Sequence, residues 1–477
     1  MNFDFKECLD KFGEVGYVRQ VWHAVGMIEG MPGVTLHEVV VGERGGLAWV
    51  IGLGTEGAEV VWLTGDLVKI GERMARTGEA LAVMVNEEML GRTVDGLGQV
   101  SGEPMKGKLE KRLVELVPGG IVGRAVVDKA LETGVSIVDV VLPLGKGQRE
   151  LVIGDRRSGK SRFVRQVVVT QVQSGAVCVY CLVGKRQEDL VRLKQFLSRY
   201  NAVEKVVIVE AGADDVPGAI VMAPYTAMAI AEYFRDLGRD VLLVLDDLTL
   251  HATFYRQIAL LLRRFPGRNS YPGDIFHLHA KLLERAGNFI KGSITCLPVA
   301  EATFGDLSGY IQTNLMAVTD GHLFFDGDLA NLGRLPALNP FLSVTRVGRQ
   351  AQMPLLADAS RVVGEFLARE QHVRQFLHFG AELTEKVQRE LALGDRLYGC
   401  FFLSSEDMVP IGMSALLLGA LWAGQWEGVS VKVMQQEMKK LIDRYRGEAR
   451  YRQEVDELLA GMNKFEQLVG KLREKPL

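Results

Sequence analysis

Cysteine is scarce in this sequence, and no apolar run is long. The chain has 477 residues and its five cysteines stand at positions 8, 178, 181, 296 and 400. So few cysteines argue against a disulfide-stapled secreted fold and fit a reducing compartment. The most apolar stretch, IGMSALLLGALWAG at 411–424, is shorter than the ~20 residues that a membrane-spanning helix needs. The first residues, MNFDFKECLDKFGEVG, have no basic start followed by an apolar core, so we expect no secretory signal.

A large net charge, internal repeats and low-complexity segments are missing as well. Lysine and arginine number 56 and the acids 59, which leaves a formal net charge of −3. This balance gives no strong attraction to nucleic acid or to anionic lipid, so we expect no nucleic-acid partner. Hydrophobic residues make up 48% and charged residues 24%, a globular composition. The length predicts two to four domains.

The chain has three regions with different residue patterns, which predicts a multidomain fold. Residues 1–82 hold an N-terminal segment and short apolar runs between turns, such as LAWVIGL and AEVVWLT, which predict a β-barrel. Residues 83–355 alternate apolar strand runs with amphipathic stretches, which predicts an α/β domain around a parallel sheet. Residues 356–477 carry apolar residues at spacings of three and four, which predicts an α-helical bundle with solvated charges.

Cys178 and Cys181 have the CxxC spacing of metal and redox sites. The run around them, VCVYCLV, is apolar and is typical of a buried strand, in which residues three apart point to opposite faces. We therefore interpret both cysteines as core residues, with a metal or redox role as the alternative.

A complete phosphate-binding loop lies in IGDRRSGKS. The pattern G-x-x-x-x-G-K-[ST] is filled by Gly154, Asp155, Arg156, Arg157, Ser158, Gly159, Lys160 and Ser161. It follows a predicted strand, RELVI, and precedes a predicted helix, which is the context that the motif requires. Glycines let the backbone wrap phosphates, and the helix start offers free N–H groups. We expect Lys160 to reach the terminal phosphates of ATP or ADP and the Ser161 hydroxyl to bind Mg²⁺.

A partner carboxylate is expected at the end of a second apolar strand. DVLLVLDDL supplies Asp246, followed directly by Asp247. Ligands of α/β folds bind at the carboxyl ends of strands, so we predict that Asp246 binds Mg²⁺ through water. For Asp247 we favour a helix N-cap, because the helical stretch LTLHATFYRQIALLL follows.

Several longer strings resemble one family closely. PLGKGQRELVIGDRRSGKS, DDLTLHATFYRQIALLLRRFPGRNSYPGDIFHLHAKLLERAG and SVTRVG are similar to the F-type ATP synthases, and to their alpha rather than their beta subunits. The resemblance covers roughly residues 17–400 and weakens beyond. It implies a β-barrel, a P-loop nucleotide-binding domain and a helical domain. It also implies a subunit that binds Mg-ATP without turning it over.

The same resemblance implies partners and a location. Alpha subunits alternate with catalytic beta subunits in a ring around the central gamma stalk. The ring is coupled to a membrane sector that moves H⁺ or Na⁺, so it lies peripherally at the cytoplasmic face of the membrane. A longer N-terminal helix usually contacts the delta subunit of the peripheral stalk. Only about 15 residues precede the predicted barrel here, so that attachment is left open, although FDFKECLDKFGE can form a short amphipathic helix.

Two positions in the nucleotide site depart from the family. Alpha subunits usually have glutamine where this chain has Arg157 and Lys185, and catalytic beta subunits have a glutamate at the latter position. A lysine cannot act as the carboxylate that orients the attacking water. The resemblance therefore implies a site that holds nucleotide but does not hydrolyse it. The added charges can tighten nucleotide binding; drift without effect is the alternative. Glu188 and Asp189 follow, but we interpret them as acids of a first helical turn.

Arg346 in FLSVTRVG matches the alpha arginine that reaches into the neighbouring beta active site. A guanidinium offers a rigid fork of donors to developing phosphoryl charge. Without the surrounding string, a surface salt bridge would be the better interpretation. The resemblance gives Ser343 a supporting role at that interface. Glu301, Gln171 and Gln312 are equally open to a ligand-orienting or a structural hydrogen-bonding role.

Three other functions share the P-loop core. A homohexameric ATPase of a secretion or flagellar export system needs its own carboxylate at position 185. An RNA-translocating helicase needs an N-terminal module with exposed aromatic and basic residues, whereas the predicted barrel is acidic and glycine-rich. A scaffold without nucleotide does not account for Lys160, Ser161 and Asp246.

Overall fold

The computed structural model of the chain describes residues 3–65, 68–120, 123–303, 305–378, 384–403 and 408–477. Two compact units make up the chain. The first unit comprises residues 1–126, 149–153 and 172–320, and the second comprises 127–148, 154–171 and 321–477. Along the sequence come a β-barrel, an α/β nucleotide-binding region and a helical region, so the predicted fold class is confirmed.

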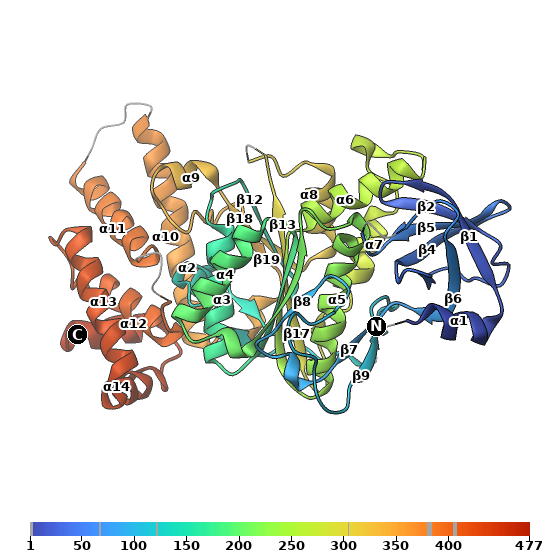
Figure 1. Cartoon of the computed structure of the whole chain (residues 1–477). Helices are drawn as coiled ribbons and strands as arrows, with labels where there is room; N and C mark the ends of the chain where they lie inside the picture. The colour runs from blue at the N-terminus through green and yellow to red at the C-terminus, as the bar shows by residue number, and fades with distance from the viewer. Residues whose placement is uncertain (1–2, 66–67, 121–122, 304, 379–383, 404–407) are drawn as a thin grey trace. The chain divides into compact units, whose positions relative to one another are not determined.

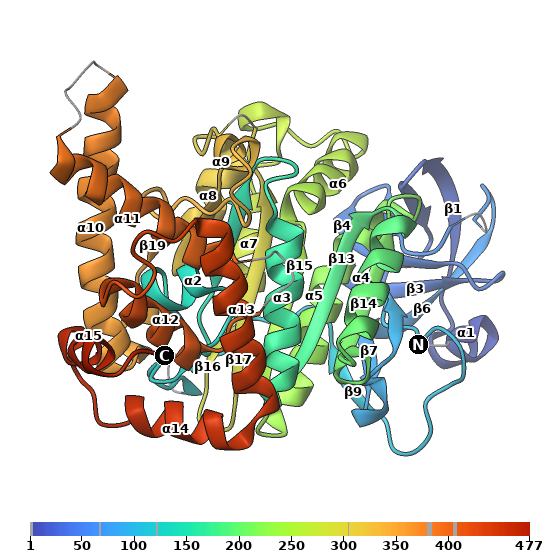
Figure 2. The same ribbon diagram turned by 90° about the vertical axis from the view of Figure 1, so that its left-hand side faces the viewer.

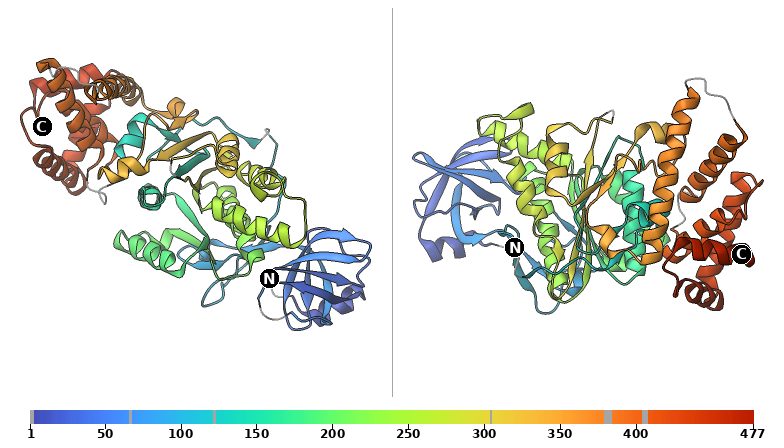
Figure 3. Two further views of the ribbon diagram at one scale, coloured as in Figure 1. Left: turned by 90° about the horizontal axis from the view of Figure 1, so that it is seen from above. Right: turned by 180° about the vertical axis from the view of Figure 1, so that it is seen from behind.

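The barrel belongs to the first unit and appears in blue in Figures 1 and 3. Its strands close in the order β1, β2, β5, β4, β3, β6. Their bounds are β1 Val15–Trp22, β2 Val25–Glu29, β3 Glu38–Gly42, β4 Leu47–Gly54, β5 Gly57–Trp62 and β6 Arg73–Ala80. The interior is filled by buried valine, alanine and methionine side chains with Trp62. The runs LAWVIGL and AEVVWLT are the strands β4 and β5, as predicted.

A short amphipathic helix, α1 (Phe5–Phe12), precedes the barrel. Asp4 caps it by accepting a hydrogen bond from the Glu7 amide at 3.0 Å. The helix packs on β6, where Arg73 lies over the Phe5 ring and Arg76 over the Phe12 ring. In this structure, α1 therefore uses its aromatic face to cover the barrel.

The first unit also holds a parallel sheet with the strand order β12, β17, β15, β13, β14, β8. Figure 2 shows β13, β14 and β15 side by side, and their register pairs confirm it. The bounds are β8 Thr93–Asp95, β12 Glu150–Gly154, β13 Val177–Lys185, β14 Val206–Gly212, β15 Asp240–Asp246 and β17 Ser293–Glu301. Nearly every residue of β13, β15 and β17 is buried, which is typical of a sheet with both faces covered.

Helices of the first unit cover this sheet and position the strand ends. Helix α5 packs on β13, β14 and β15, and α6 contacts β13 and β17. The helices are α4 Gln187–Arg199, α5 Pro217–Asp236, α6 Leu248–Leu261, α7 Ile275–Leu283 and α8 Tyr310–Val318. Because the strands are parallel, their carboxyl ends, including Lys185 and Asp246, meet at one edge.

The second unit is mostly helical. It holds α2 Ser136–Val141, α3 Lys160–Gln173, α10 Pro354–His378, α11 Glu385–Phe401, α12 Ile411–Trp422, α13 Val431–Gly447, α14 Ala449–Leu459 and α15 Phe465–Glu474. The apolar run at 411–424 forms α12, which is buried against α2, α14 and α15. Strands β18 (Gly321–Phe325) and β19 (Val344–Thr345) pair antiparallel. Within the described part of the chain, no helix has the length and apolarity to cross a bilayer.

Candidate functional site

The phosphate-binding loop lies in the second unit, between β12 and α3. Glycine is required at its first position, because a Cβ at Gly154 would collide with the Phe325 carbonyl. Gly159 has φ +100° and Arg157 has φ +63°, so the loop turns through left-handed conformations just before the helix. The loop therefore has the wrapped backbone that the motif predicts.

The Lys160 ammonium closes this loop from inside. It donates to the carbonyls of Gly154 and Asp155, both at 2.6 Å. Ser158 donates its hydroxyl to the Asp155 carbonyl at 2.7 Å. Lys160 as a whole is 8% exposed. The ammonium is thus held inside the loop, next to the backbone that a phosphate would contact.

Helix α3 starts at Lys160 and runs for 14 residues. Its first N–H groups have no partner inside the helix and carry the positive end of the helix dipole. Ser161 stands in this first turn and is exposed, as are Arg156 and Arg157. The loop and helix start together make a cationic, donor-rich surface suited to a polyphosphate.

A second group of predicted residues meets in the first unit, at the carboxyl ends of β13 and β15. The Lys185 ammonium lies 2.8 Å from Asp246 Oδ1 and 3.0 Å from Asp247 Oδ2. The Tyr180 hydroxyl donates to Asp246 Oδ2 at 3.0 Å. Both aspartates are buried, with 3% and 1% exposure. Burial opposes the lysine charge, but the two carboxylates outweigh it and raise the pKa of Lys185 above its ordinary value.

Asp247 has the N-cap role that the sequence favours. Its Oδ1 accepts a hydrogen bond from the Leu250 amide at 2.6 Å, at the start of α6. Glu188 and Asp189 lie in the first turn of α4, as predicted, and Glu188 pairs with Arg192 one turn on. The acids that follow Lys185 are therefore first-turn charges of α4.

Arg346 lies in the second unit, directly after β19, and its side chain is exposed. The strand is held firmly before it. Thr345 donates its hydroxyl to the Pro143 carbonyl at 3.0 Å and accepts from Gln148 Nε2 at 3.2 Å. Ser343 is buried; its hydroxyl donates to the Asn339 carbonyl at 2.6 Å and accepts from the Phe324 amide at 2.9 Å. Ser343 and Thr345 thus fix the backbone on which Arg346 is presented.

The other candidate polar residues, Gln312, Glu301 and Gln171, have structural contacts. Gln312 donates its amide to the Glu301 carbonyl at 2.6 Å, and the Glu301 amide donates to the Thr249 hydroxyl at 3.0 Å. Gln171 donates to the Glu132 carbonyl at 2.6 Å. These bonds support the structural interpretation of the two glutamines.

Cys178 and Cys181 are both free and buried in β13. Burial raises the pKa of each thiol above its ordinary value. A protonated, enclosed thiol is a poor nucleophile and a poor metal ligand. The core interpretation of this CxxC is therefore the one that the structure supports.

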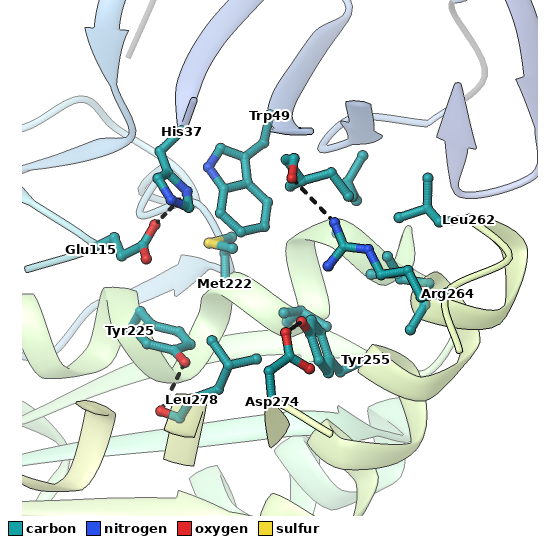
Figure 4. Close-up of a pocket in the computed structure, with 16 residues that line it drawn as sticks. His37, Trp49, Glu115, Met222, Tyr225, Tyr255, Leu262, Arg264, Asp274 and Leu278 are labelled. Atoms are coloured by element: carbon teal, nitrogen blue, oxygen red, sulfur yellow. Dashed lines mark hydrogen bonds and ion pairs between the residues drawn. The ribbon is translucent and has the colours of Figure 1, made fainter. Parts of the chain in front are cut away.

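Figure 4 shows a cavity of about 130 Å³ elsewhere in the first unit. Its apolar lining includes Trp49 and Met222. Two pairs of its polar groups lie close together: His37 Nδ1 is 3.2 Å from Glu115 Oε2, and the Tyr255 hydroxyl donates to Asp274 at 2.6 Å. None of the predicted site residues lines this cavity.

Comparison with known proteins decides the family. The nucleotide-binding domain of the ATP synthase alpha/beta family matches residues 134–345. ATP synthase subunit alpha 1 of Chlorobium luteolum is 36% identical over 439 residues, which cover 90% of this chain and 85% of that protein. ATP synthase subunit alpha of Rickettsia bellii is 36% identical over 404 residues, covering 82% and 79%. ATP synthase subunit alpha 2 of Polaromonas naphthalenivorans is 37% identical over 431 residues, covering 88% and 82%.

The chain belongs to the ATP synthase alpha subunit family. This confirms the resemblance drawn from the sequence and makes the chain a nucleotide-binding subunit of an ATP synthase. The nucleotide that the family implies fits the loop, because Lys160 and the start of α3 offer the donors that phosphates need.

The magnesium ion that the family implies fits this alpha subunit only in part. Ser161 offers a suitable hydroxyl at the helix start. For Asp246, the Lys185 ammonium lies 2.8 Å from Oδ1, which accepts no hydrogen bond from the residues that the structure describes, and the Tyr180 hydroxyl donates to Oδ2. Magnesium prefers carboxylate oxygens that are free to bind it or its water ligands. The metal role of Asp246 stays a prediction.

Tyr180 is the member of this group that sequence reasoning missed. It stands in β13 two positions before Leu182, which lies opposite Asp246 in the neighbouring strand. Side chains two apart share one face of a strand. A register between the two strands would have shown that Tyr180 can reach Asp246, but an apolar run such as VCVYCLV gives no register by itself.

Proposed function

We propose that this chain is the non-catalytic, ATP-binding alpha subunit in the head of a rotary F-type ATP synthase. It holds ATP or ADP on residues 154–161 and lends Arg346 to a neighbouring beta subunit. The beta subunit performs the synthesis or hydrolysis that is coupled to ion transport. Support comes from the family, from the phosphate-binding loop and from the exposed, well-anchored position of Arg346.

The residue that carries the non-catalytic assignment is Lys185. Hydrolysis needs a group that accepts a proton from the attacking water or orients it. At position 185 the alpha subunit has an ammonium instead, and two buried carboxylates hold it in place. Asp246 and Asp247 are themselves engaged by that ammonium, so neither is a free base. A homohexameric export ATPase would instead need a carboxylate of its own at position 185.

Arg346 is the proposed contribution to catalysis in trans. Its guanidinium is exposed, while the strand before it is fixed by Thr345 and Ser343. A fixed, exposed cation can meet phosphoryl charge on a partner without a large loss of side-chain freedom. The proposed assembly alternates this chain with beta subunits around gamma, at the cytoplasmic face of the membrane. The delta and peripheral-stalk contact of α1 remains a proposal.

The test is reconstitution of the head from this chain with its beta and gamma partners. Arg346→Ala should lower multisite ATP hydrolysis by about 10³-fold or more, because arginines supplied in trans contribute about 10³–10⁵ to such rates. ATP bound to the alpha subunit itself should stay unchanged, because its own loop is intact. Turnover and nucleotide content of the assembled complex are the two measurements.

Arg349→Ala is the matched control, because Arg349 is an exposed arginine three residues further on. It should leave turnover near that of the unchanged complex. Equal turnover with and without Arg346 would refute the trans assignment. Sustained release of ADP and phosphate by the purified chain alone would refute the non-catalytic one.

A further inference from the structure

The cavity in Figure 4 lies between the barrel on one side and helices α5, α6 and α7 on the other, all within the first unit. Its barrel side includes Trp49 of β4 and Val61 of β5, and its helical side includes Met222, Tyr225 and Tyr255. Its volume of about 130 Å³ is close to the ~150 Å³ of an apolar cavity that binds benzene. The space is therefore large enough for a single aromatic ring.

Contacts between the walls fix the dimensions of this cavity. Arg264, which follows α6, donates to the Ile51 carbonyl of β4 at 3.1 Å. Between α5 and α7, the Tyr225 hydroxyl donates to the Leu278 carbonyl at 3.1 Å. Helix α5 also packs against β5. Because these contacts hold the barrel and the helices at a set distance, a ligand would meet a preformed site.

One end of the cavity carries a pair of buried polar atoms. His37 Nδ1 and Glu115 Oε2 lie 3.2 Å apart, and neither has a hydrogen-bond partner among the described residues. The other oxygen of this carboxylate, Oε1, accepts from the Lys281 ammonium at 2.7 Å, which fixes its position. Buried polar atoms without a partner are costly and rare. The pair therefore points to a ligand that places a polar group at this end.

The backbone of His37 keeps its imidazole at this end. Its φ of +67° is one that residues other than glycine seldom adopt. Its amide donates to the Val50 carbonyl at 2.8 Å, and its ring centroid lies 5.5 Å from that of Trp49. Strained backbone that the surroundings maintain is concentrated at functional sites. The His37 side chain is 44% exposed, so it stands at the mouth of the cavity and leaves a route for entry.

We propose that this cavity binds a small neutral phenol, a single aromatic ring that carries a hydroxyl group. A hydroxyl donates and accepts at once, so it can donate to Glu115 Oε2 and accept from His37 in the tautomer that carries the Nδ1 proton. The ring would lie against Trp49 and Met222, because aromatic faces and thioethers attract aromatic edges. The proposal goes beyond the proposed function, since the phosphate-binding loop does not line this cavity.

The test is isothermal titration calorimetry of the purified full-length chain with phenol. Phenol should bind at a single site, and at least about tenfold more tightly than toluene, which has the ring but leaves His37 Nδ1 and Glu115 Oε2 unpaired. Cyclohexanol has the hydroxyl without the aromatic ring and should bind about 3-fold more weakly than phenol, or worse. Benzoate should not bind, because its negative charge would meet the Glu115 carboxylate.

Ala259→Leu locates the site. Ala259 is buried in α6 and lines the cavity, so a leucine there would fill the space that the ring needs. The affinity for phenol should fall at least about tenfold. Ala368→Leu is the matched control, because it makes the same change at an exposed position of α10 and should leave the affinity unchanged. Undiminished phenol binding in the Ala259 variant would place the phenol at another site and overturn the proposal.

Two further outcomes would overturn it without any variant. If the unchanged chain does not bind phenol, the cavity is a space for water and not a ligand site. If phenol and toluene bind equally well, the hydroxyl makes no bond with His37 and Glu115. Saturating ATP should leave the phenol affinity unchanged, and competition between the two would mean that phenol occupies the nucleotide site instead.

Discussion

His251 and His279 are both fully buried, and His251 Nδ1 lies 3.1 Å from His279 Nε2. His251 Nε2 lies 3.1 Å from the Val221 carbonyl, which fixes a proton on that nitrogen. His251 Nδ1 must then accept from His279. The pair is therefore neutral in the folded chain, with one defined tautomer for each ring.

This pair predicts loss of stability in mild acid. Burial lowers the pKa of His251 to about 4, and burial with the charge of its neighbour lowers that of His279. Unfolded histidines titrate near 6.5, so the unfolded state binds protons first. The stabilisation is complete above about pH 6.5 and is lost as the pH falls toward 4. His251 alone should cost about 2 kcal/mol at about pH 5, and His279 should add to this loss, measured by urea unfolding against pH.

Replacement of one histidine should flatten that dependence. His279→Gln keeps a donor for His251 but removes one titrating group, so the change in unfolding midpoint between about pH 7.5 and about pH 5 should shrink. His277→Gln is the control, because His277 is exposed two positions earlier in the same helix. An undiminished pH response in the His279 variant would show that other groups control acid stability.

At the same scale, sequence reasoning found the charged residues but not their pairing. The resemblance to the family identifies Lys185 as a lysine in place of the glutamate of beta subunits, because the surrounding strings align the position. It does not identify the partners of Lys185, since the contact to Asp246 depends on the parallel register of β13 and β15. Two adjacent buried strands of uniform apolarity fit several registers equally well, and only the three-dimensional structure selects one.

Among the elements, β19 is short but holds the backbone before Arg346. It contains only Val344 and Thr345, and β18 pairs with it through Gly321 and His322. So short a strand forms only a short ladder of backbone hydrogen bonds with β18. The side-chain bonds of Thr345 to Pro143 and Gln148 add the anchoring that the ladder lacks.

Thr345→Val should therefore weaken the contribution of Arg346 without removing it. Valine keeps the shape but loses two hydrogen bonds, each contributing roughly 0.5–1.5 kcal/mol. In the reconstituted complex, multisite turnover should fall by about 3- to 10-fold, because a misplaced arginine stabilises the transition state less. The ATP affinity of the alpha subunit should not change, and both quantities are measured on the same preparation.

Rescue separates positioning from a general loss of stability. Thr345→Ser restores the hydroxyl and should recover most of the turnover. Val344→Thr changes an exposed residue of the same strand and should be neutral. Full turnover in the valine variant would show that the hydrogen bonds of Thr345 do not position Arg346.

Periodicity predicted most elements correctly because each carries a consistent local signal. The apolar runs before Gly154, around Cys178 and before Asp246 are the strands β12, β13 and β15. Within the helical region predicted for 356–477, residues 451–472 are divided between α14 and α15, with a break after Leu459. Gly461 and Asn463 lie in that break, and such residues favour turns. The spacing of apolar residues alone does not predict the break between α14 and α15.

For the molecule as a whole, the family could be predicted because long strings, and not single motifs, carried it. The P-loop alone is shared by many ATPases. The segments around residues 246–287 and 341–348 distinguish alpha subunits, and the comparison with ATP synthase alpha subunits agrees over 90% of the chain. The strings could not show which charged side chains pair with one another, because such pairs depend on contacts between residues far apart in sequence.

Nucleotide binding should be visible in the stability of the whole chain. A ligand that binds only the folded state adds RT ln(1 + [L]/Kd) to the unfolding free energy, about 2.7 kcal/mol at one hundred times Kd. ATP at that excess should raise the unfolding temperature of the unchanged chain by a few degrees. Lys160→Ala should lose most of this rise, because the ammonium at the centre of the loop is gone. Lys440→Ala removes an equal charge from the exposed face of α13 and should keep the full rise. If ATP stabilises the Lys160 variant as well as it stabilises the unchanged chain, the nucleotide is held at another site. Loss of this ammonium would weaken ATP binding only at the loop.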